Sequence, residues 1–149
     1  MIIYTLGFTQ KSAQKFFETI KKHQIELLID VRLNNNSQLA SFTKGRDLPY
    51  FLKELCDCAY IHEVAFAPTK EILDNYKKDR ISWEEYEISF NLLQEKRKVY
   101  EIFRKKYSSF DKVLLLCSEP QANNCHRRLV AEHIKEKLSD LNIEIRHLL

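Results

Sequence analysis

Residues 113–130 read VLLLCSEPQANNCHRRLV and contain the change of pattern that decides the fold. The first four residues are apolar and are typical of a strand buried on both faces of a sheet. Pro120 then prevents the strand from continuing, because it has no backbone N–H for the ladder. Asn123 or Asn124 is expected to cap the helix that follows, at about residues 125–138. This order of strand, polar loop and helix predicts an open α/β sheet with a ligand site at the loop.

Short apolar runs and amphipathic segments alternate along the rest of the chain. Strands are predicted at residues 2–6, 27–31, 59–61, 113–116 and 143–146, and helices at residues 12–22, 47–58, 69–77, 82 to about 103, and 125–138. Repeated strand and helix units require a parallel sheet with helices on both faces. We therefore predict one domain over residues 1–149, an α/β three-layer sandwich with a mainly parallel, Rossmann-like sheet and a helical insert. The asparagine-rich residues 33–46 are the longest candidate for a functional loop.

The composition narrows the classes of function without choosing one. The 149 residues carry a formal net charge of +3, which permits an anionic partner but does not require nucleic acid. No apolar run reaches the roughly 20 residues of a membrane span, so a soluble protein without a membrane partner is predicted. The four cysteines accompany no signal peptide, and we expect reduced thiols in a cytoplasmic protein.

Polar and chemically versatile residues follow the predicted strands at their carboxyl ends. These residues are Gly7, Asp30, Arg32, His62, Glu63, Cys117, Ser118, Glu119 and His147. Because parallel strands bring these ends to one edge of the sheet, we expect one polar pocket there. Gly7 suits a turn at positive φ or the close approach of a ligand. Burying the charges of Asp30 and Arg32 is costly unless they are paired or used, which favours a functional role.

Six segments of the chain, taken in their order and spacing, resemble a known protein family. They are YTLGFT (4–9), LLIDVR (27–32), YIHEVAFAPTKE (60–71), ISWEEYE (81–87), LLLCSE (114–119) and CHRR (125–128). Together they resemble the bacterial and archaeal family called domain of unknown function 488, over essentially the whole chain. The resemblance implies an α/β fold and a shared pocket, but no established reaction, so function has to be argued from the site.

The resemblance also implies which positions belong to the pocket. The residues at matching motif positions are Gly7, Asp30, Arg32, Cys117, Glu119, Cys125, His126 and Arg127. The chain departs from the family pattern at Phe8 and Thr9, where a histidine and a serine are typical. A mechanism that needs that histidine as a base would have to use His126 or His62 instead.

The first functional interpretation is an enzyme, or an enzyme-like site, for a phosphate- or nucleotide-like anion. Amides at a helix N-terminus bind anionic groups, and Arg32 and Arg127 would add paired donors. The same helix terminus predicts a lowered pKa for the Cys125 thiol, which with the adjacent His126 suggests a nucleophilic thiolate. The candidate catalytic residues are Asp30, Glu119, Cys125 and His126. The candidate ligand-binding residues are Gly7, Arg32, Cys117, Ser118 and Arg127.

Structural interpretations of the same residues remain open. Cys125 also suits a small buried apolar position, and Arg127 an ion pair with Glu119 or Asp30 that fixes the loop. Neighbouring helix positions point about 100 degrees apart, so Cys125 and His126 need not face the same ligand.

A second functional interpretation is a binding module for nucleic acid or a nucleotide, without turnover. It rests on Arg127, Arg128, the asparagine-rich loop and a basic cluster in the helical insert. The cluster consists of Lys96, Arg97, Lys98, Arg104, Lys105 and Lys106. Glu95 and Glu101 interrupt it, and such runs are usually a solvated helix face.

A metal site and sulfur transfer are minor alternatives. Two sets of residues have ligand-like spacing, but neither contains a paired C-x2-C, and no metal-ligating residue is assigned. The sets are Cys56, Cys58 and His62, and Cys117, Glu119, Cys125 and His126. LLIDVR followed later by LLLC is similar to the rhodanese-like pattern, yet the loop after Cys117 has no glycine to form a tight ring of amides.

Three aromatic residues at helical spacing, Trp83, Tyr86 and Phe90, predict a buried core face rather than a base-stacking platform. The sequence selects neither a cofactor nor an oligomeric state.

Overall fold

Five parallel strands form one sheet in the computed structural model, which describes residues 1–36 and 40–149. They are β1 (Ile2–Gly7), β2 (Leu27–Asp30), β3 (Ala59–His62), β4 (Lys112–Cys117) and β5 (Glu144–His147), in the spatial order β3-β2-β4-β1-β5. The predicted strands are confirmed to within one residue at each end. Residues 37–39 of the predicted functional loop lie outside the described residues.

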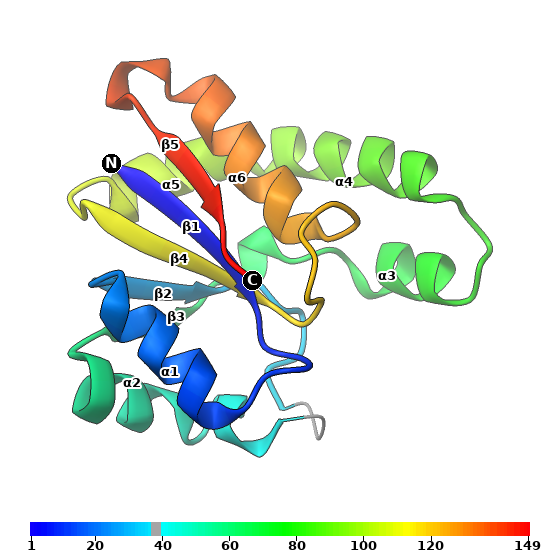
Figure 1. Cartoon of the computed structure of the whole chain (residues 1–149). Coiled ribbons are helices and arrows are strands. Elements are labelled where there is room, and N and C mark those ends of the chain that lie inside the picture. The colour runs from blue at the N-terminus through cyan, green and yellow to red at the C-terminus, as the bar shows by residue number, and fades with distance from the viewer. Residues whose placement is uncertain (37–39) are drawn as a thin grey trace.

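Helices cover both faces of the sheet (Figure 1). One face carries α1 (Ala13–Lys22) and α2 (Leu48–Cys56); the other carries α4 (Trp83–Arg97), α5 (Val99–Tyr107) and α6 (His126–Lys137), with α3 (Lys70–Lys77) packed beside α4. Short 3-10 turns at Ser41–Thr43, Val64–Phe66 and Ser139–Leu141 lie in the connections. The predicted three-layer α/β sandwich with a helical insert is confirmed. Within the described ranges, no helix combines the length and apolarity needed to cross a membrane.

The chain reverses its direction across the sheet after β3, and the helices change face at the same point. From β1 the chain steps through α1 to β2 and through α2 to β3, toward one edge. It returns through α3, α4 and α5 to β4, and then through α6 to β5. Because parallel crossovers are right-handed, the return places the later helices on the opposite face. Ligands bind at such switch points, outside the carboxyl ends of the strands.

Two apolar cores flank the sheet, because alternate residues of each strand point to opposite faces. Val113 and Leu115 of β4 belong to the core under α4, α5 and α6. Leu114 and Leu116 belong to the core under α1 and α2. Cys117 continues the first set, so its thiol lies on the α6 side of the sheet.

The same alternation in β2 directs its last residue to the other side. Leu27 and Ile29 pack in the core under α4, α5 and α6, whereas Leu28 packs under α1 and α2. Asp30, two residues after Leu28, therefore points toward the α1 and α2 layer. The sheet separates the Asp30 carboxylate from the Cys117 thiol.

The long helix predicted from residue 82 is two helices. Lys98, in the left-handed region at φ 53° and ψ 53°, separates α4 from α5. Phe90 and Gln94 are buried on α4, and continued helical spacing would turn residues 97, 98 and 101 inward. The break instead lets Val99 and Phe103 of α5 reach the core.

The start of α6 also differs from the prediction. Its N-cap is Cys125, which makes no side-chain capping bond, so the predicted cap at Asn123 or Asn124 is wrong. The loop makes another turn first: the Cys125 N–H donates to the Ala122 carbonyl, and Arg128 Nε donates to the Asn123 carbonyl at 3.0 Å. The first amides of α6 therefore have no side-chain cap.

Candidate functional site

A cavity of about 400 Å³ opens at the carboxyl ends of β2 and β4, at the switch point of the sheet. Its floor comes from the β4–α6 loop and its facing wall from α3 and α4, which lie side by side in Figure 1. Six of the nine predicted site residues line it. They are Arg32, Cys117, Ser118, Glu119, Cys125 and His126.

Three aromatic side chains form the wall of this cavity, and we call them the aromatic wall: Tyr76 of α3 with Trp83 and Tyr86 of α4. The rings of Trp83 and Tyr86 are stacked, with centroids 5.0 Å apart and planes 18° apart. Tyr76 packs against both, at centroid separations of 5.6 and 5.1 Å. Tyr86 and Phe90 are buried as predicted, whereas Trp83 is only half-buried and borders the cavity. The three-residue spacing of Trp83 and Tyr86 indicates a shared face but not a cavity beside it.

Two thiols and an imidazole form the floor of the cavity. Cys117, Cys125 and His126 are 6, 3 and 5% exposed, and their ligand atoms all lie within 4.8 Å of one another. Cys117 Sγ is 3.7 Å from His126 Nδ1. His126 Nε2 is 2.6 Å from the Val31 carbonyl oxygen, which can only accept, so the proton is on Nε2 and Nδ1 is an acceptor. Phe90 packs edge-on against the imidazole, at a centroid distance of 5.6 Å.

The two thiols have opposite pKa shifts. A hydrogen bond from Cys125 lowers the pKa of Cys117 against the effect of burial, with help from the Ser118 amide and the Arg127 charge. The same bond, together with burial, raises the pKa of Cys125 well above its ordinary value. The lowered pKa predicted for Cys125 is therefore wrong. The hydrogen bonds favour the charged form of Cys117 instead.

The side chain of Arg127 binds backbone carbonyls of the loop that forms the floor. Its side chain is fully buried, and it donates from Nη1 to the Glu119 carbonyl at 2.5 Å and from Nη2 to the Pro120 carbonyl at 3.4 Å. The loop is thus fixed through carbonyl oxygens, and neither Glu119 nor Asp30 forms an ion pair with Arg127 among the described residues. The exposed side chain of Glu119 stands at the rim of the cavity.

Gly7 is where the floor loop meets β1. Its φ is not positive, so the predicted turn at positive φ is wrong. A group does approach Gly7 closely, but it is the floor loop and not a ligand. A Cβ on Gly7 would lie 1.6 Å from the Glu119 carbonyl oxygen. Thr9 continues this contact, since its Oγ1 donates to the Ser118 carbonyl at 2.7 Å.

Asp30 and Arg32 form a buried ion pair beside the cavity. Arg32 donates from Nε to Oδ1 at 2.8 Å and from Nη2 to Oδ2 at 2.7 Å, and the Tyr60 hydroxyl donates to Oδ2 at 2.7 Å. Arg32 Nη2 also donates to the Thr43 carbonyl at 2.7 Å. Phe8 lies over the guanidinium, 5.0 Å from Arg32 Cζ to the ring centroid, at the position where the family pattern has histidine. The charges are thus paired with each other.

The other predicted metal set is not assembled. Cys58 lies in the core under α1 and α2, where burial raises its pKa to about 12. His62 Nε2 donates to the Arg32 carbonyl at 2.7 Å, and Cys56 Sγ lies 3.4 Å from the Phe17 carbonyl. Over residues 1–36 and 40–149, the floor of the cavity supplies the one group of three His, Cys, Asp or Glu side chains close enough for a metal ion.

The basic cluster of the helical insert is partly engaged in the fold. Arg97 Nη1 donates to the Ala65 and Ala67 carbonyls at 3.0 and 2.6 Å. Lys106 pairs with Glu63 at 3.1 Å, and Arg104 pairs with Asp140 on η3 (Ser139–Leu141) at 2.8 Å. These contacts hold the insert to neighbouring segments and reduce the charge available to a nucleic acid.

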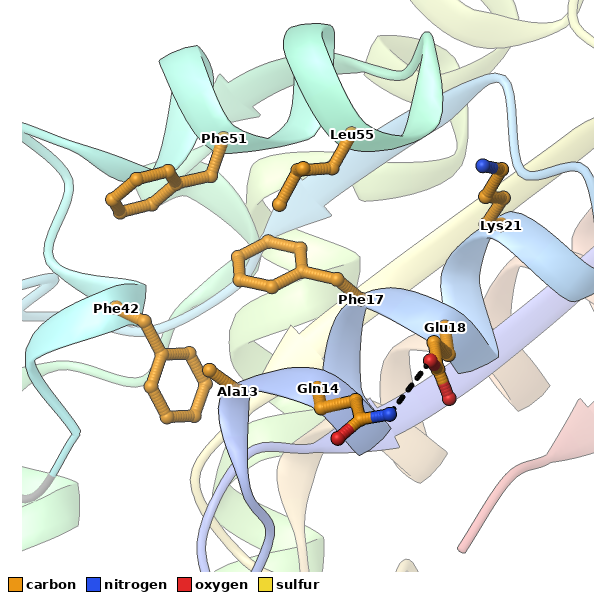
Figure 2. Close-up of a pocket in the computed structure, with 8 residues that line it drawn as sticks. All are labelled: Ala13, Gln14, Phe17, Glu18, Lys21, Phe42, Phe51 and Leu55. Carbon is orange, nitrogen blue, oxygen red and sulfur yellow. Dashed lines mark hydrogen bonds between the residues drawn. The ribbon is translucent and has the colours of Figure 1, made fainter.

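A second cavity of about 400 Å³ lies between α1 and α2 (Figure 2). Phe17, Phe42 and Phe51 gather around it. Its polar residues are Gln14, Glu18 and Lys21, and Gln14 donates to Glu18 at 3.0 Å. None of the nine predicted site residues lines it, and it brings no reactive groups together.

The profile of one protein family, described as "Domain of unknown function DUF488", matches residues 12–134. No curated protein and no solved structure gives a significant match. The matched range contains the aromatic wall, the floor and the buried ion pair. It begins after Gly7, Phe8 and Thr9, so the departure from the family pattern at Phe8 and Thr9 lies outside it.

Proposed function

The chain belongs to the DUF488 family, and we propose that it is an enzyme-like protein that binds a small anionic ligand carrying a flat ring. The observation that carries this proposal is the cavity of about 400 Å³ with an aromatic wall facing a floor of thiols and imidazole. Ligand cavities of this size are typically apolar with a few convergent polar groups.

The aromatic wall is the reason to expect a flat ring in the ligand. Trp83 is half-buried and stacked on Tyr86, so a planar group entering the cavity would extend an existing stack. Such aromatic pairs contribute about 0.5–1.5 kcal/mol beyond the burial of their area. Burial raises the pKa of Tyr86, so its hydroxyl stays protonated and can donate a hydrogen bond.

Two sources of positive charge at the cavity are the reason to expect an anionic group in the ligand. Lys77 of α3 lines the wall, and the first amides of α6 lie at the floor without a side-chain cap. A helix N-terminus carries roughly half a positive charge and favours phosphate or carboxylate groups. Arg32 contributes little net charge because Asp30 neutralises it, so we assign both of them to positioning the floor.

The candidate catalytic residues divide by their access to the cavity. Glu119 and His126 line it and remain candidates for proton transfer, and Cys125 belongs to the reactive floor. Asp30 does not line it, and its carboxylate is already hydrogen-bonded to Arg32 and Tyr60. Its proposed role is therefore to hold the end of β2.

The test is a thermal-shift screen that separates the ring from the anion. The probes are nucleoside monophosphates and aryl phosphates, the matching nucleosides and phenols, and inorganic phosphate. A ligand at a hundredfold excess over its Kd stabilises the native state by about 2.7 kcal/mol, so compounds with both features should raise Tm most. Trp83→Leu and Lys77→Ala should each reduce the shift.

The matched control is Ile88→Ala, an exposed apolar residue on α4 that does not line this cavity. It should leave the shift unchanged. Equal shifts in wild type and Trp83→Leu, or no shift with any compound that carries both features, would contradict the proposal. A compound that passes this test then becomes the starting point for turnover assays.

A further inference from the structure

We infer that Cys117, Cys125 and His126 bind one zinc-type divalent ion, whose fourth coordination position is open to the cavity. Such an ion would be the reactive centre of the site, and only the occupant of its open position rests on the proposed function.

The three ligand atoms lie near the spacing that a tetrahedral site requires. Zinc bonds of about 2.3 Å to sulfur and about 2.0 Å to nitrogen place neighbouring ligand atoms about 3.5–3.8 Å apart. Cys117 Sγ and His126 Nδ1 are 3.7 Å apart, and all three atoms fall within 4.8 Å. Cys117 ends β4 and Cys125 is the residue directly before α6, so the sheet and the helix fix the backbone of both cysteines.

The imidazole has the tautomer that a metal ligand needs. Its Nε2–H donates to the Val31 carbonyl at 2.6 Å, which leaves Nδ1 without a proton, 3.7 Å from Cys117 Sγ. The same sulfur is 4.0 Å from Nε2, so it lies beside the ring, and the ring must turn to direct the Nδ1 lone pair at a shared metal ion. Metal-binding histidines commonly donate their second ring nitrogen to a backbone carbonyl in this way. Phe90 packs edge-on against the ring, at a centroid distance of 5.6 Å.

The chemistry of the set selects the class of metal. Thiolates and imidazole favour zinc and related transition metals over magnesium or calcium, which prefer oxygen. Two thiolates and a neutral imidazole around a divalent ion give a centre with no net charge, which suits a floor at least 94% buried. Binding releases the two thiol protons to solvent and involves no oxidation.

The site has an open position because the described residues supply three ligands in this group. Structural zinc sites have four protein ligands, whereas catalytic sites have three and leave the fourth for water or substrate. All three ligands line the cavity, so that fourth position faces the bound ligand.

The experiment is a cobalt titration of the full chain, purified without chelator and kept reduced with a phosphine. Cobalt in this site should give the visible bands of four-coordinate Co²⁺ and near-ultraviolet thiolate-to-cobalt charge transfer, saturating at one ion per chain. Zinc should displace it. Added azide should shift the visible bands, because it occupies the open position.

Variants separate this site from other thiols and from the proposed ligand. Cys117→Ser and His126→Gln should each weaken cobalt binding at least tenfold, whereas the Cys56→Ser/Cys58→Ser double variant should bind as wild type. Circular dichroism identifies any variant that does not fold. In that case the test uses wild type instead, where bound cadmium should protect Cys117 and Cys125 from alkylation. Trp83→Leu should keep the cobalt spectrum, so loss of ligand binding and loss of metal binding are distinguishable.

Absence of thiolate-to-cobalt bands in folded wild-type protein would overturn the inference. So would bands that persist in Cys117→Ser and disappear in the Cys56→Ser/Cys58→Ser control. A cobalt spectrum insensitive to azide would overturn the open fourth position.

Discussion

The fully buried guanidinium of Arg127 donates to the backbone carbonyl of Glu119 at 2.5 Å and thereby fixes the loop that forms the floor of the cavity. An arginine beside a suspected anion site is readily assigned to the ligand. Here Nη1 and Nη2 of Arg127 donate to protein carbonyls, so its removal should affect stability.

The first prediction is that Arg127→Met destabilises the fold by about 3 kcal/mol, because two loop carbonyls lose a charged donor whose side chain is fully buried. Arg127→Lys should lose less, since one amine can still reach one carbonyl. Urea denaturation measures both changes. An Arg127→Met protein with wild-type stability would show that the two hydrogen bonds contribute nothing.

The second prediction concerns the two glycines of the chain. Gly7→Ala should be strongly destabilising, because its Cβ would lie 1.6 Å from the Glu119 carbonyl oxygen and the backbone must move. Gly45→Ala should cost much less, since its Cβ would meet the Asn35 side chain, which can rotate away. Thermal melting of the two variants compares them directly, and equal losses would contradict the predicted difference.

The third prediction is that Asp30→Asn destabilises the protein by about 3–5 kcal/mol, because it leaves the charge of Arg32 buried without its partner. Tyr60→Phe removes only one hydrogen bond to Asp30 and should cost about 1 kcal/mol. Denaturant midpoints measure both. If Tyr60→Phe proved less stable than Asp30→Asn, the ion pair would not be the main stabilising interaction of this cluster.

The fourth prediction uses Trp83, the only tryptophan of the chain. Because Trp83 lines the cavity, a ligand bound there should change its fluorescence emission and shield it from acrylamide. A titration then gives the Kd of any compound found by thermal shift. A compound that raises Tm without changing Trp83 emission would bind elsewhere, for instance in the cavity between α1 and α2.

The fifth prediction is a pH dependence of stability that arises from His133. Burial lowers the pKa of His133, with Glu95 raising it and Lys137 lowering it further by smaller amounts. Below the ordinary histidine pKa of about 6.5 the unfolded chain takes up a proton before the folded chain does. The contribution of His133 to the free energy of unfolding is therefore intact above that pH and falls as the pH decreases.

Urea denaturation of wild type and His133→Gln between pH 7.5 and 5.5 tests this sign. The variant should lose less stability than wild type over that interval. Parallel losses in the two proteins would mean that other groups cause the acid destabilisation.

The sequence predicts the sheet well because its strands are short apolar runs with clear polar ends. It cannot predict which face each end residue takes. Residues 113–116 are apolar at every position, so no alternation indicates that Cys117 lies on the α6 side and Asp30 of the neighbouring strand on the other. The separation of Asp30 from Cys117 thus depends on which face the alternation of each strand directs its last residue to, which only the structure shows.

The aromatic wall illustrates a second limit. Trp83 and Tyr86 have the spacing of a buried helix face. The break at Lys98 that divides the insert contains no glycine or proline from which it could be predicted. Where α4 lies relative to the sheet depends on this break and on tertiary contacts. The sequence therefore identifies the cysteines and the histidine of the floor but misses the surface that faces them.

The wall and the floor of the cavity come from two separate stretches of the chain, residues 68–86 and residues 117–126. Under the proposed function, recognition of the ring and chemistry at the floor are therefore encoded in different places. Changes to the helical insert should then alter which ligand is admitted while the floor stays intact, so that the two properties can be engineered one at a time.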